Sequence, residues 1–142
     1  MTGAALRIFD TPPAGAFDAI FRALDESSRA TIGDARPRLL AIPIHNADGS
    51  IAGGLWSHTL FGWLHIEMMV VPEALRFRGI GSALLAAAEA EARHRGCLGA
   101  IVDTFSFQAA PFYRKMGFDQ YAVLEDCPHG HQRLFFKKRF DH

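Results

Sequence analysis

The sequence lacks several features that mark specialised classes of protein. It has only two cysteines, Cys97 and Cys127, without a pairing motif, which favours a reduced, cytoplasmic compartment over a disulfide-linked secreted protein. Fifteen basic and fifteen acidic side chains cancel, which argues against a nucleic-acid or membrane surface. Apolar runs end well before the ~18 residues of a membrane span, and the first residues lack the pattern of a signal peptide. We therefore expect a cytoplasmic protein that binds neither nucleic acid nor membrane.

The chain nevertheless has enough apolar residues to fold. Hydrophobic residues make up 49% of the 142, which fits one domain, residues 1–142, with a core of ordinary size. Residues 5–9 form a short apolar run that predicts a first strand. An amphipathic helix is expected next, because apolar residues recur at helical spacing at Phe17, Ile20, Phe21 and Leu24. The polar segment 27–37 is either a second short helix or a loop.

The middle and the end of the chain alternate between strands and helices. Three apolar segments separated by tight turns predict an antiparallel meander, at residues 38–45, 51–60 and 63–71. A helix from about Gly81 to Arg95 and a strand at Gly99–Phe105 follow, and this order predicts a βαβ unit with parallel strands. A short helix and two strands complete the order, at residues 108–116, 118–125 and 134–140. The sequence thus predicts an α/β fold with a mixed sheet of six to seven strands, an antiparallel meander and a central βαβ unit.

The long helix of this unit is rich in alanine, which lets it lie close to a sheet. Four of its residues are predicted to face the sheet: Leu84, Leu85, Ala88 and Ala92. Glu89 precedes Arg93 by four residues, and Glu91 precedes Arg95 in the same way. Acid before base at this spacing stabilises a helix surface, so both pairs are expected on the solvent face.

A glycine-rich turn lies between the third strand of the meander and this helix. Gly79 and Gly81 stand where the helix begins, and glycine allows a ligand to approach the backbone closely. The free N–H groups of the first turn and the helix dipole together make an anion site that best fits a phosphate. The turn lacks the Gly-Lys-Ser/Thr of a P-loop and the third glycine of a dinucleotide fingerprint. It reads instead Arg-x-x-Gly-x-Gly from Arg76, after a strand that ends in Val-Val-Pro.

This turn resembles the cofactor-binding turn of the GNAT superfamily of N-acetyltransferases. A second signature lies downstream, where the sequence from Ser106 to Phe118 is similar to the family's Asn-x-x-Ala-x-x-x-Tyr-x-x-x-Gly-Phe. Two positions depart from the family pattern, because Ser106 replaces an asparagine and Phe77 replaces the first glycine of the turn. The stretch that begins at Asp103 also resembles a bacterial branch of the superfamily whose members are mostly unassigned for substrate.

The resemblance implies acetyl-CoA as cosubstrate and a GNAT-like fold whose strands splay apart at the cofactor site. In that family, backbone amides of the turn hold the pyrophosphate, and the preceding strand pairs with the pantetheine arm. The matching positions of this sequence are the expected cofactor-binding residues: Met69, Val70, Val71, Arg76, Phe77, Arg78, Gly79, Ile80, Gly81, Ser82, Ser106 and Tyr113.

Three residues are candidates for the chemistry. The resemblance implies Tyr113 as general acid, and a phenol of pKa ~10 can exchange a proton with a thiol of ~8.5; the alternative is a core aromatic. Glu67 is the first candidate for general base, because a carboxylate inside an apolar strand needs a partner or a task. Its alternative is a structural or exposed carboxylate. His65 is the second candidate base. Strand alternation predicts that His65, Glu67 and Met69 share one face.

No metal site is predicted. Cys127, His129 and His131 lie within five residues of one another, which is too few ligands, too close together, for a closed zinc site. The segment is either a border of the acceptor cleft or a plain surface turn.

Two functions follow from these observations. The first is an acetyl-CoA-dependent N-acetyltransferase that acts on a primary amine of a small molecule, by direct attack in a ternary complex. The alternative is a non-catalytic acyl-CoA-binding sensor or accessory module. A homodimer through the late strands is left open, and the sequence does not identify the acceptor amine.

Overall fold

The computed structural model describes residues 5–33 and 36–141 and divides the chain into two units, residues 1–35 and 36–142. The described part of the first unit holds one helix, α1 (Ala16–Ile32), which confirms the amphipathic helix and continues it into the polar segment, where Gly33 caps it. The strand predicted at residues 5–9 is wrong, because these residues form no strand. A strand needs a neighbour to receive its backbone hydrogen bonds, and the described part of this unit offers only a helix.

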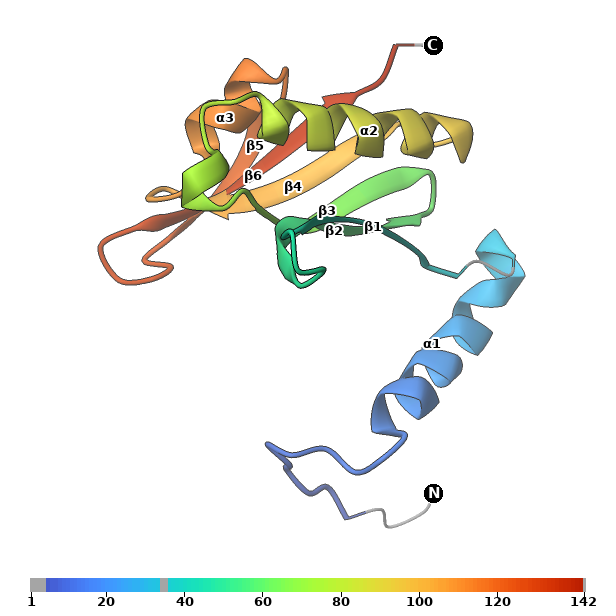
Figure 1. Ribbon diagram of the computed structural model, residues 1–142. Helices are drawn as coiled ribbons and strands as arrows, with labels where there is room; N and C mark the ends of the chain where they lie inside the picture. Colours follow the sequence, from blue (N-terminus) through green and yellow to red (C-terminus); the bar gives the residue numbers. More distant parts are fainter. Residues whose placement is uncertain (1–4, 34–35, 142) are drawn as a thin grey trace. The chain divides into compact units, whose positions relative to one another are not determined.

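The second unit is a six-stranded mixed sheet with its helices (Figure 1). The strands are β1 (Arg38–His45), β2 (Ile51–Leu60), β3 (Trp63–Val70), β4 (Gly99–Phe105), β5 (Asp119–Glu125) and β6 (Gln132–Arg139), in the order β1-β2-β3-β4-β6-β5. The helices are η1 (Glu73–Leu75), α2 (Ile80–His94) and α3 (Ala110–Lys115). β1, β2 and β3 pair antiparallel, while β3 and β4 pair parallel across the α2 crossover. The predicted meander and βαβ unit are therefore confirmed.

The core of this unit lies between the sheet and α2, with α3 on the same side of the sheet (Figure 1). The predicted inner face of α2 is buried as expected, from Leu84 to Ala92. It packs in one cluster with alternate residues of the central strands, among them Leu64, Ala100 and Phe136, none of which is exposed. Of the described helices, none is long and apolar enough to cross a membrane.

A β-bulge interrupts β3 at Glu67. Ile66 pairs with Ser57 and Met68 pairs with Trp56, so Glu67 is the extra residue and has no partner on β2. The parallel pairing of β3 with β4 ends at the same level, after Ile66 and Val102. Because a bulge bends the strand that carries it, β3 and β4 diverge beyond this point, as expected for strands that splay at a cofactor site.

The bulge also corrects the predicted alternation along β3. Met69, which was expected on the face of His65 and Glu67, packs against the core instead. Met68 is 63% exposed. One inserted residue exchanges the two faces of every residue that follows it, and the sequence of this strand carries no sign of the insertion.

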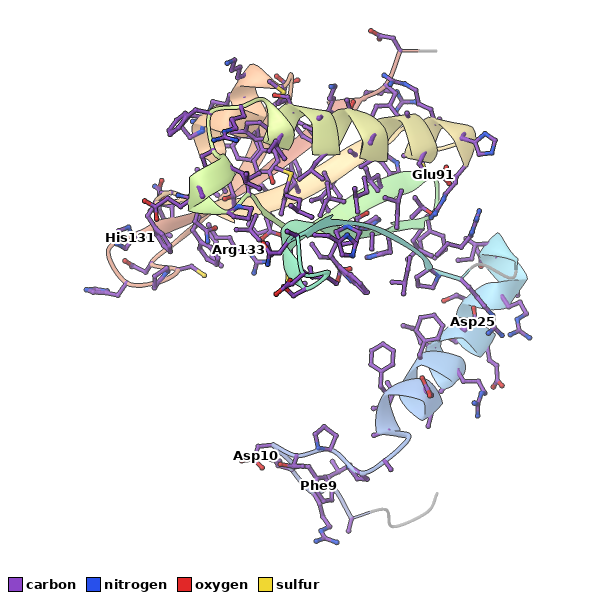
Figure 2. The ribbon with its side chains drawn as sticks, viewed as in Figure 1. Phe9, Asp10, Asp25, Glu91, His131 and Arg133 are labelled. Atoms are coloured by element: carbon purple, nitrogen blue, oxygen red, sulfur yellow. The ribbon has the colours of Figure 1, made fainter. Side chains whose placement is uncertain are left out.

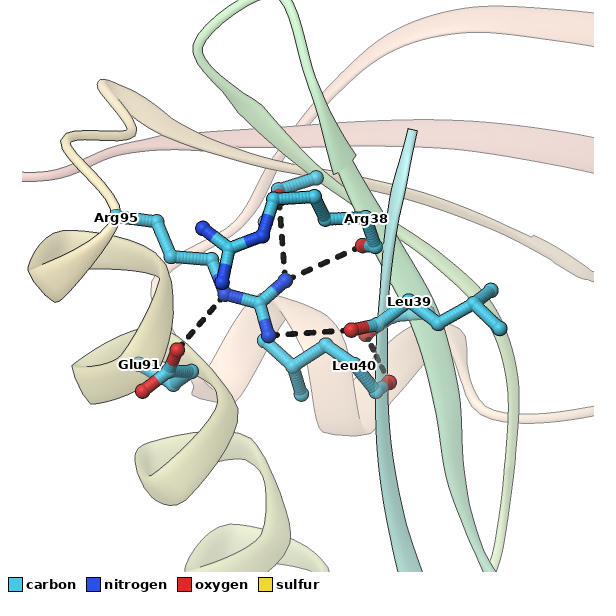
Figure 3. A network of polar contacts seen from close by, with 7 residues as sticks. Arg38, Leu39, Leu40, Glu91 and Arg95 are labelled. Carbon is cyan, nitrogen blue, oxygen red and sulfur yellow. Dashed lines mark hydrogen bonds and ion pairs between the residues drawn. The ribbon is translucent and has the colours of Figure 1, made fainter. Parts of the chain in front are cut away.

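The C-terminal end of α2 is fixed to the edge of the sheet by Arg95 (Figure 3). Its guanidinium donates to the carboxylate of Glu91 at 2.7 Å, which confirms this predicted pair. It also donates to the carbonyl oxygens of Arg38 and Leu39 on β1 and to the hydroxyl of Thr59 on β2. The planar guanidinium has five N–H donors and can therefore bond several acceptors at once. Besides its pair with Glu91, Arg95 thus holds the end of α2 in place over the sheet.

The prediction that Glu89 lies on the solvent face is wrong. Its side chain is 6% exposed, and its carboxylate lies 2.9 Å from the ammonium group of Lys138 on β6. Helical spacing finds partners only within the helix, whereas this partner comes from a strand 49 residues later in the chain. The pair joins α2 to β6, the strand next to β4 in the sheet.

Candidate functional site

The turn before α2 has the geometry of an anion site. Gly79 caps the helix in the left-handed region, at φ 76° and ψ 11°. The N–H of Ala83 bonds the carbonyl of Gly79, so the N–H groups of the residues between them lie ahead of the first intrahelical bond. The first turn of the helix also has no acidic residue. Free amides and the positive end of the helix dipole therefore meet at this turn without a carboxylate to oppose an anion.

The position of Phe77 explains one departure from the family pattern. Its φ is 63°, in the left-handed region that favours glycine, and its side chain is fully exposed. The backbone here thus has a conformation that glycine adopts without strain, although a bulky residue occupies it. Arg76 donates from its Nε to the carbonyl of Val71 at 3.1 Å, and this bond ties the turn to the end of β3. Arg78 is exposed.

Gly81 offers a test of whether this turn binds a ligand. A methyl group added there would lie 3.5 Å from the ring of Phe112 and 3.8 Å from Val71, which are ordinary contact distances. We expect Gly81→Ala to leave the fold intact and to raise the stability by up to about 1 kcal/mol, because alanine is the better helix former. If the glycine serves the close approach of a pyrophosphate, the same variant binds acetyl-CoA more weakly. Thermal unfolding with and without acetyl-CoA separates the two effects; unchanged affinity would remove Gly81 from the site.

A pocket of about 440 Å³ lies where the strands diverge. It opens on the face of the sheet opposite α2, since His65 and Ile101 line it and alternate with core residues. Its lining combines titratable, aromatic and apolar residues: His58, His65, Ile66, Glu67, Ile101, Val102, Asp103, Tyr121, Arg133 and Phe135. A volume of this size suits a small molecule. The structure brings both candidate bases, His65 and Glu67, to this pocket.

Two polar pairs flank the pocket. On one side, Nδ1 of His58 lies 3.2 Å from a carboxylate oxygen of Glu67, and the rings of His58 and His65 stack with their centroids 4.6 Å apart. On the other side, Nε of Arg133 donates to Asp103 at 2.8 Å; Figure 2 labels Arg133 on its strand. Burial, and next the nearby His58, lower the pKa of His65, so His65 is neutral at pH 7.

His58 and the second pair were missed in the sequence. The hairpin between β2 and β3 would have located His58, because a turn at Phe61 and Gly62 sets Leu60 opposite Trp63 and thus His58 opposite His65. The pairing of β4 with β6 has no such local signal, because the two strands are far apart in the chain.

Tyr113 lies on α3, in the core, and is 4% exposed. Its ring contacts those of Phe112 and Phe118 edge to face. Burial, and next the negative charge of Asp103, raise the pKa of Tyr113 to about 12. The Tyr113 hydroxyl makes no hydrogen bond to a described residue. Among the described residues, every fully buried side-chain oxygen has a hydrogen-bond partner. The Tyr113 hydroxyl is therefore not fully buried and retains contact with solvent. It is therefore a protonated donor at neutral pH.

The segment after β4 is held to β6 by Ser106. Its hydroxyl accepts the N–H of Gln132 at 3.0 Å, and its own N–H donates to the carbonyl of Gln132. The hydroxyl thus uses one acceptor site within the protein and keeps its O–H donor, so the expected contact of Ser106 with the cofactor stays a prediction. Further along, the ring of His131, which Figure 2 labels, meets that of Phe107 edge to face, and His129 is fully exposed. Among the described residues, no three metal-binding side chains gather.

Comparisons with known proteins identify the family of this chain. A model of the acetyltransferase (GNAT) family matches residues 7–118. Acetyltransferase Atu2258 of Agrobacterium fabrum is 41% identical over 131 residues, which cover 92% of this chain and 96% of that protein. Blasticidin-S acetyltransferase of Streptomyces morookaense is 39% identical over 110 residues, 76% of this chain and 81% of that protein. A crystal structure from Agrobacterium tumefaciens has a TM-score of 0.88 and 39% identity, and the match covers 96% of this chain and 100% of that one.

Proposed function

Because this chain belongs to the acetyltransferase (GNAT) family, we propose that it transfers the acetyl group of acetyl-CoA to a primary amine of a small molecule, by direct attack in a ternary complex. The observation that carries the proposal is the divergence of β3 and β4. The anion-binding turn follows the end of β3 on the side of α2, and the pocket opens on the other face of the sheet. A thioester lying in the gap between the strands would reach an amine held in the pocket.

The backbone of β3 beyond Ile66 is suited to the cofactor. Within the described part of the chain, its edge toward β4 has no partner strand there, so Met69, Val70 and Val71 can offer N–H and carbonyl groups to the pantetheine arm. An N–H near Val70 would serve the developing oxyanion. The amides of Gly79, Ile80, Gly81 and Ser82 would hold the pyrophosphate. These roles are proposals that a complex with the cofactor would test directly.

Tyr113 is proposed as the donor to the leaving sulfur. Its pKa of about 12 lies about 3.5 above that of a thiol, so complete proton transfer to the thiolate costs about 5 kcal/mol. The hydroxyl therefore acts mainly by donating a hydrogen bond to the developing thiolate, with solvent completing the protonation. A base on the pocket face, Glu67 or His65, would accept a proton from the amine.

The acceptor is proposed to be small, for two reasons. The pocket has the volume of a small-molecule site, and a relative with 39% identity is named for blasticidin S, a small molecule. Blasticidin S therefore belongs in the first library of amines to be tried, beside simple diamines and amino acids.

Two measurements test the proposal in sequence. Thermal unfolding is first followed with acetyl-CoA, CoA, ATP and NAD, and acetyl-CoA at 100 times its Kd should add ~2.7 kcal/mol to the stability. Release of free thiol is then measured with each amine of the library. Stabilisation by acetyl-CoA together with amine-dependent thiol release supports the proposal. Stabilisation without turnover of any amine favours the non-catalytic acyl-CoA sensor, for which the supporting observation is Ser106 at the position of the family's asparagine.

A further inference from the structure

His58 and Glu67 form a carboxylate–imidazole pair that faces the pocket. The two residues come from neighbouring strands, β2 and β3, and the bulge at Glu67 leaves that residue without a partner in the ladder. Nδ1 of His58 lies 3.2 Å from Oε2 of Glu67. The His58 side chain is 21% exposed and that of Glu67 is 47% exposed, so both remain open to a molecule in the pocket.

The hydrogen bond fixes which nitrogen of His58 is free. A carboxylate only accepts hydrogen bonds, so Nδ1 must carry the hydrogen that lies between them. In the neutral ring the proton is then absent from Nε2, whose lone pair is available as a base. His65 is hydrogen-bonded to the backbone of Leu60 instead, and Glu67 acts on it only through its charge.

We propose that His58 takes the proton from the acceptor amine at Nε2, and that Glu67 acts as the carboxylate that orients it. This inference rests on the proposed acetyl transfer and reverses the roles suggested by the sequence, in which Glu67 itself is the base. An imidazole ordinarily titrates near ~6.5 and a carboxylate near ~4.3, so the imidazole is the better match to an ammonium ion at neutral pH. Glu67 also stabilises the imidazolium that forms, as the carboxylate of a catalytic triad does.

The protons balance as follows. An ammonium ion loses one proton to Nε2 of His58, and the free amine attacks the carbonyl carbon of the thioester. The C–S bond breaks, and the nitrogen loses a second proton as the amide forms. One proton reaches solvent from His58, and the other ends on the thiolate, beside the hydroxyl of Tyr113.

The charges around His58 are few. His65 stacks on it from β3, and Glu67 pairs with it from the same strand. Across the pocket, β4 and β6 contribute Asp103 and Arg133, which neutralise each other, and β5 contributes the hydroxyl of Tyr121. The carboxylate of Glu67 is thus the charged group in contact with the ring.

A nuclear magnetic resonance experiment tests the pair without any acceptor. In protein labelled with nitrogen-15, the neutral ring of His58 is expected to carry its proton on Nδ1. In Glu67→Ala, which removes an exposed side chain, the ring should revert to the Nε2-protonated form that free imidazoles prefer. An Nε2-protonated ring in the unchanged protein would overturn the proposal.

Kinetics test the proton transfer itself. In His58→Asn the amide nitrogen takes the place of Nδ1, so the bond to Glu67 is kept and the basic nitrogen is lost. With the amine that turns over fastest in the thiol-release screen, kcat/KM should fall about 10²-fold or more at pH 7. The shape of the pH profile should also change, because a variant without this base can use only amine that is already deprotonated, and its kcat/KM should therefore keep rising with pH. His94→Asn, on the exposed end of α2, is the matched control and should change neither quantity.

The outcomes are distinct. If His58→Asn keeps kcat/KM within about threefold, Glu67 needs only a hydrogen-bond donor and is itself the base, and the proposal is wrong. If the unchanged protein turns over no amine, the acetyl transfer fails and the role of His58 fails with it, whatever the ring's tautomer.

Discussion

Replacing Tyr113 with phenylalanine is expected to lower kcat for amine acetylation by about 10² to 10³-fold, the range associated with loss of one positioned proton or hydrogen-bond donor. The change removes one oxygen and keeps the ring that packs against Phe112 and Phe118. Because the hydroxyl makes no hydrogen bond to a described residue, the fold should lose little stability. The loss therefore falls on the step in which the thiolate leaves, and thiol release at saturating acetyl-CoA measures it.

Two further measurements identify the cause of the fall in kcat. The midpoint of thermal unfolding and the Kd for acetyl-CoA should both stay close to those of the unchanged protein, since the donor acts mainly when negative charge develops on the sulfur. A variant that retains kcat within about threefold would show that Tyr113 is only a core aromatic. A variant that loses stability and affinity together would show the same, because the hydroxyl would then matter to folding rather than to the reaction.

The parts of the fold that depend on short stretches of sequence were predictable. The apolar spacing of α2, the hairpin turns of the meander and the glycines before the helix act over a few residues, and each pattern predicted the element that is observed. The resemblance to the family rested on two such stretches, the turn at Gly79 and the segment that ends at Phe118, and the comparisons confirm the family.

The features that were missed are of two kinds: an irregularity in one strand pairing, and contacts between elements that are distant in the chain. The bulge at Glu67 changes which of Met68 and Met69 is buried, and nothing in the local alternation announces it. Asp103 meets Arg133 and Glu89 meets Lys138 only once β6 has paired with β4. Local charge patterns therefore assigned Glu89 to solvent, although the sheet supplies its partner inside the protein.

Replacing Lys138 with methionine is expected to destabilise the protein by about 3 kcal/mol, the lower end of the usual effect of removing one partner of a buried ion pair, because the Lys138 side chain is 26% exposed. The carboxylate of Glu89 is 6% exposed, and both of its oxygens lie within reach of the ammonium group, at 2.9 and 3.2 Å. Without that group the carboxylate would stay buried with its charge uncompensated. Since a domain has a total stability of about 5–15 kcal/mol, the loss should be evident in urea or thermal unfolding.

Two comparisons show whether the uncompensated charge is the cause. Lys137→Met, at the exposed neighbouring position on β6, should change the stability by no more than about 0.5 kcal/mol. Adding Glu89→Leu to Lys138→Met should restore most of the lost stability, because an apolar pair of similar volume often replaces a buried ion pair without cost. A double variant as unstable as the single one would contradict this account and place the effect in packing.

The single variant should still bind acetyl-CoA, because Glu89 lies two turns beyond the start of α2, where the anion site is proposed. If the pair stabilises the helix without shaping that site, acetyl-CoA at 100 times its Kd should add ~2.7 kcal/mol to the stability of the single variant as well.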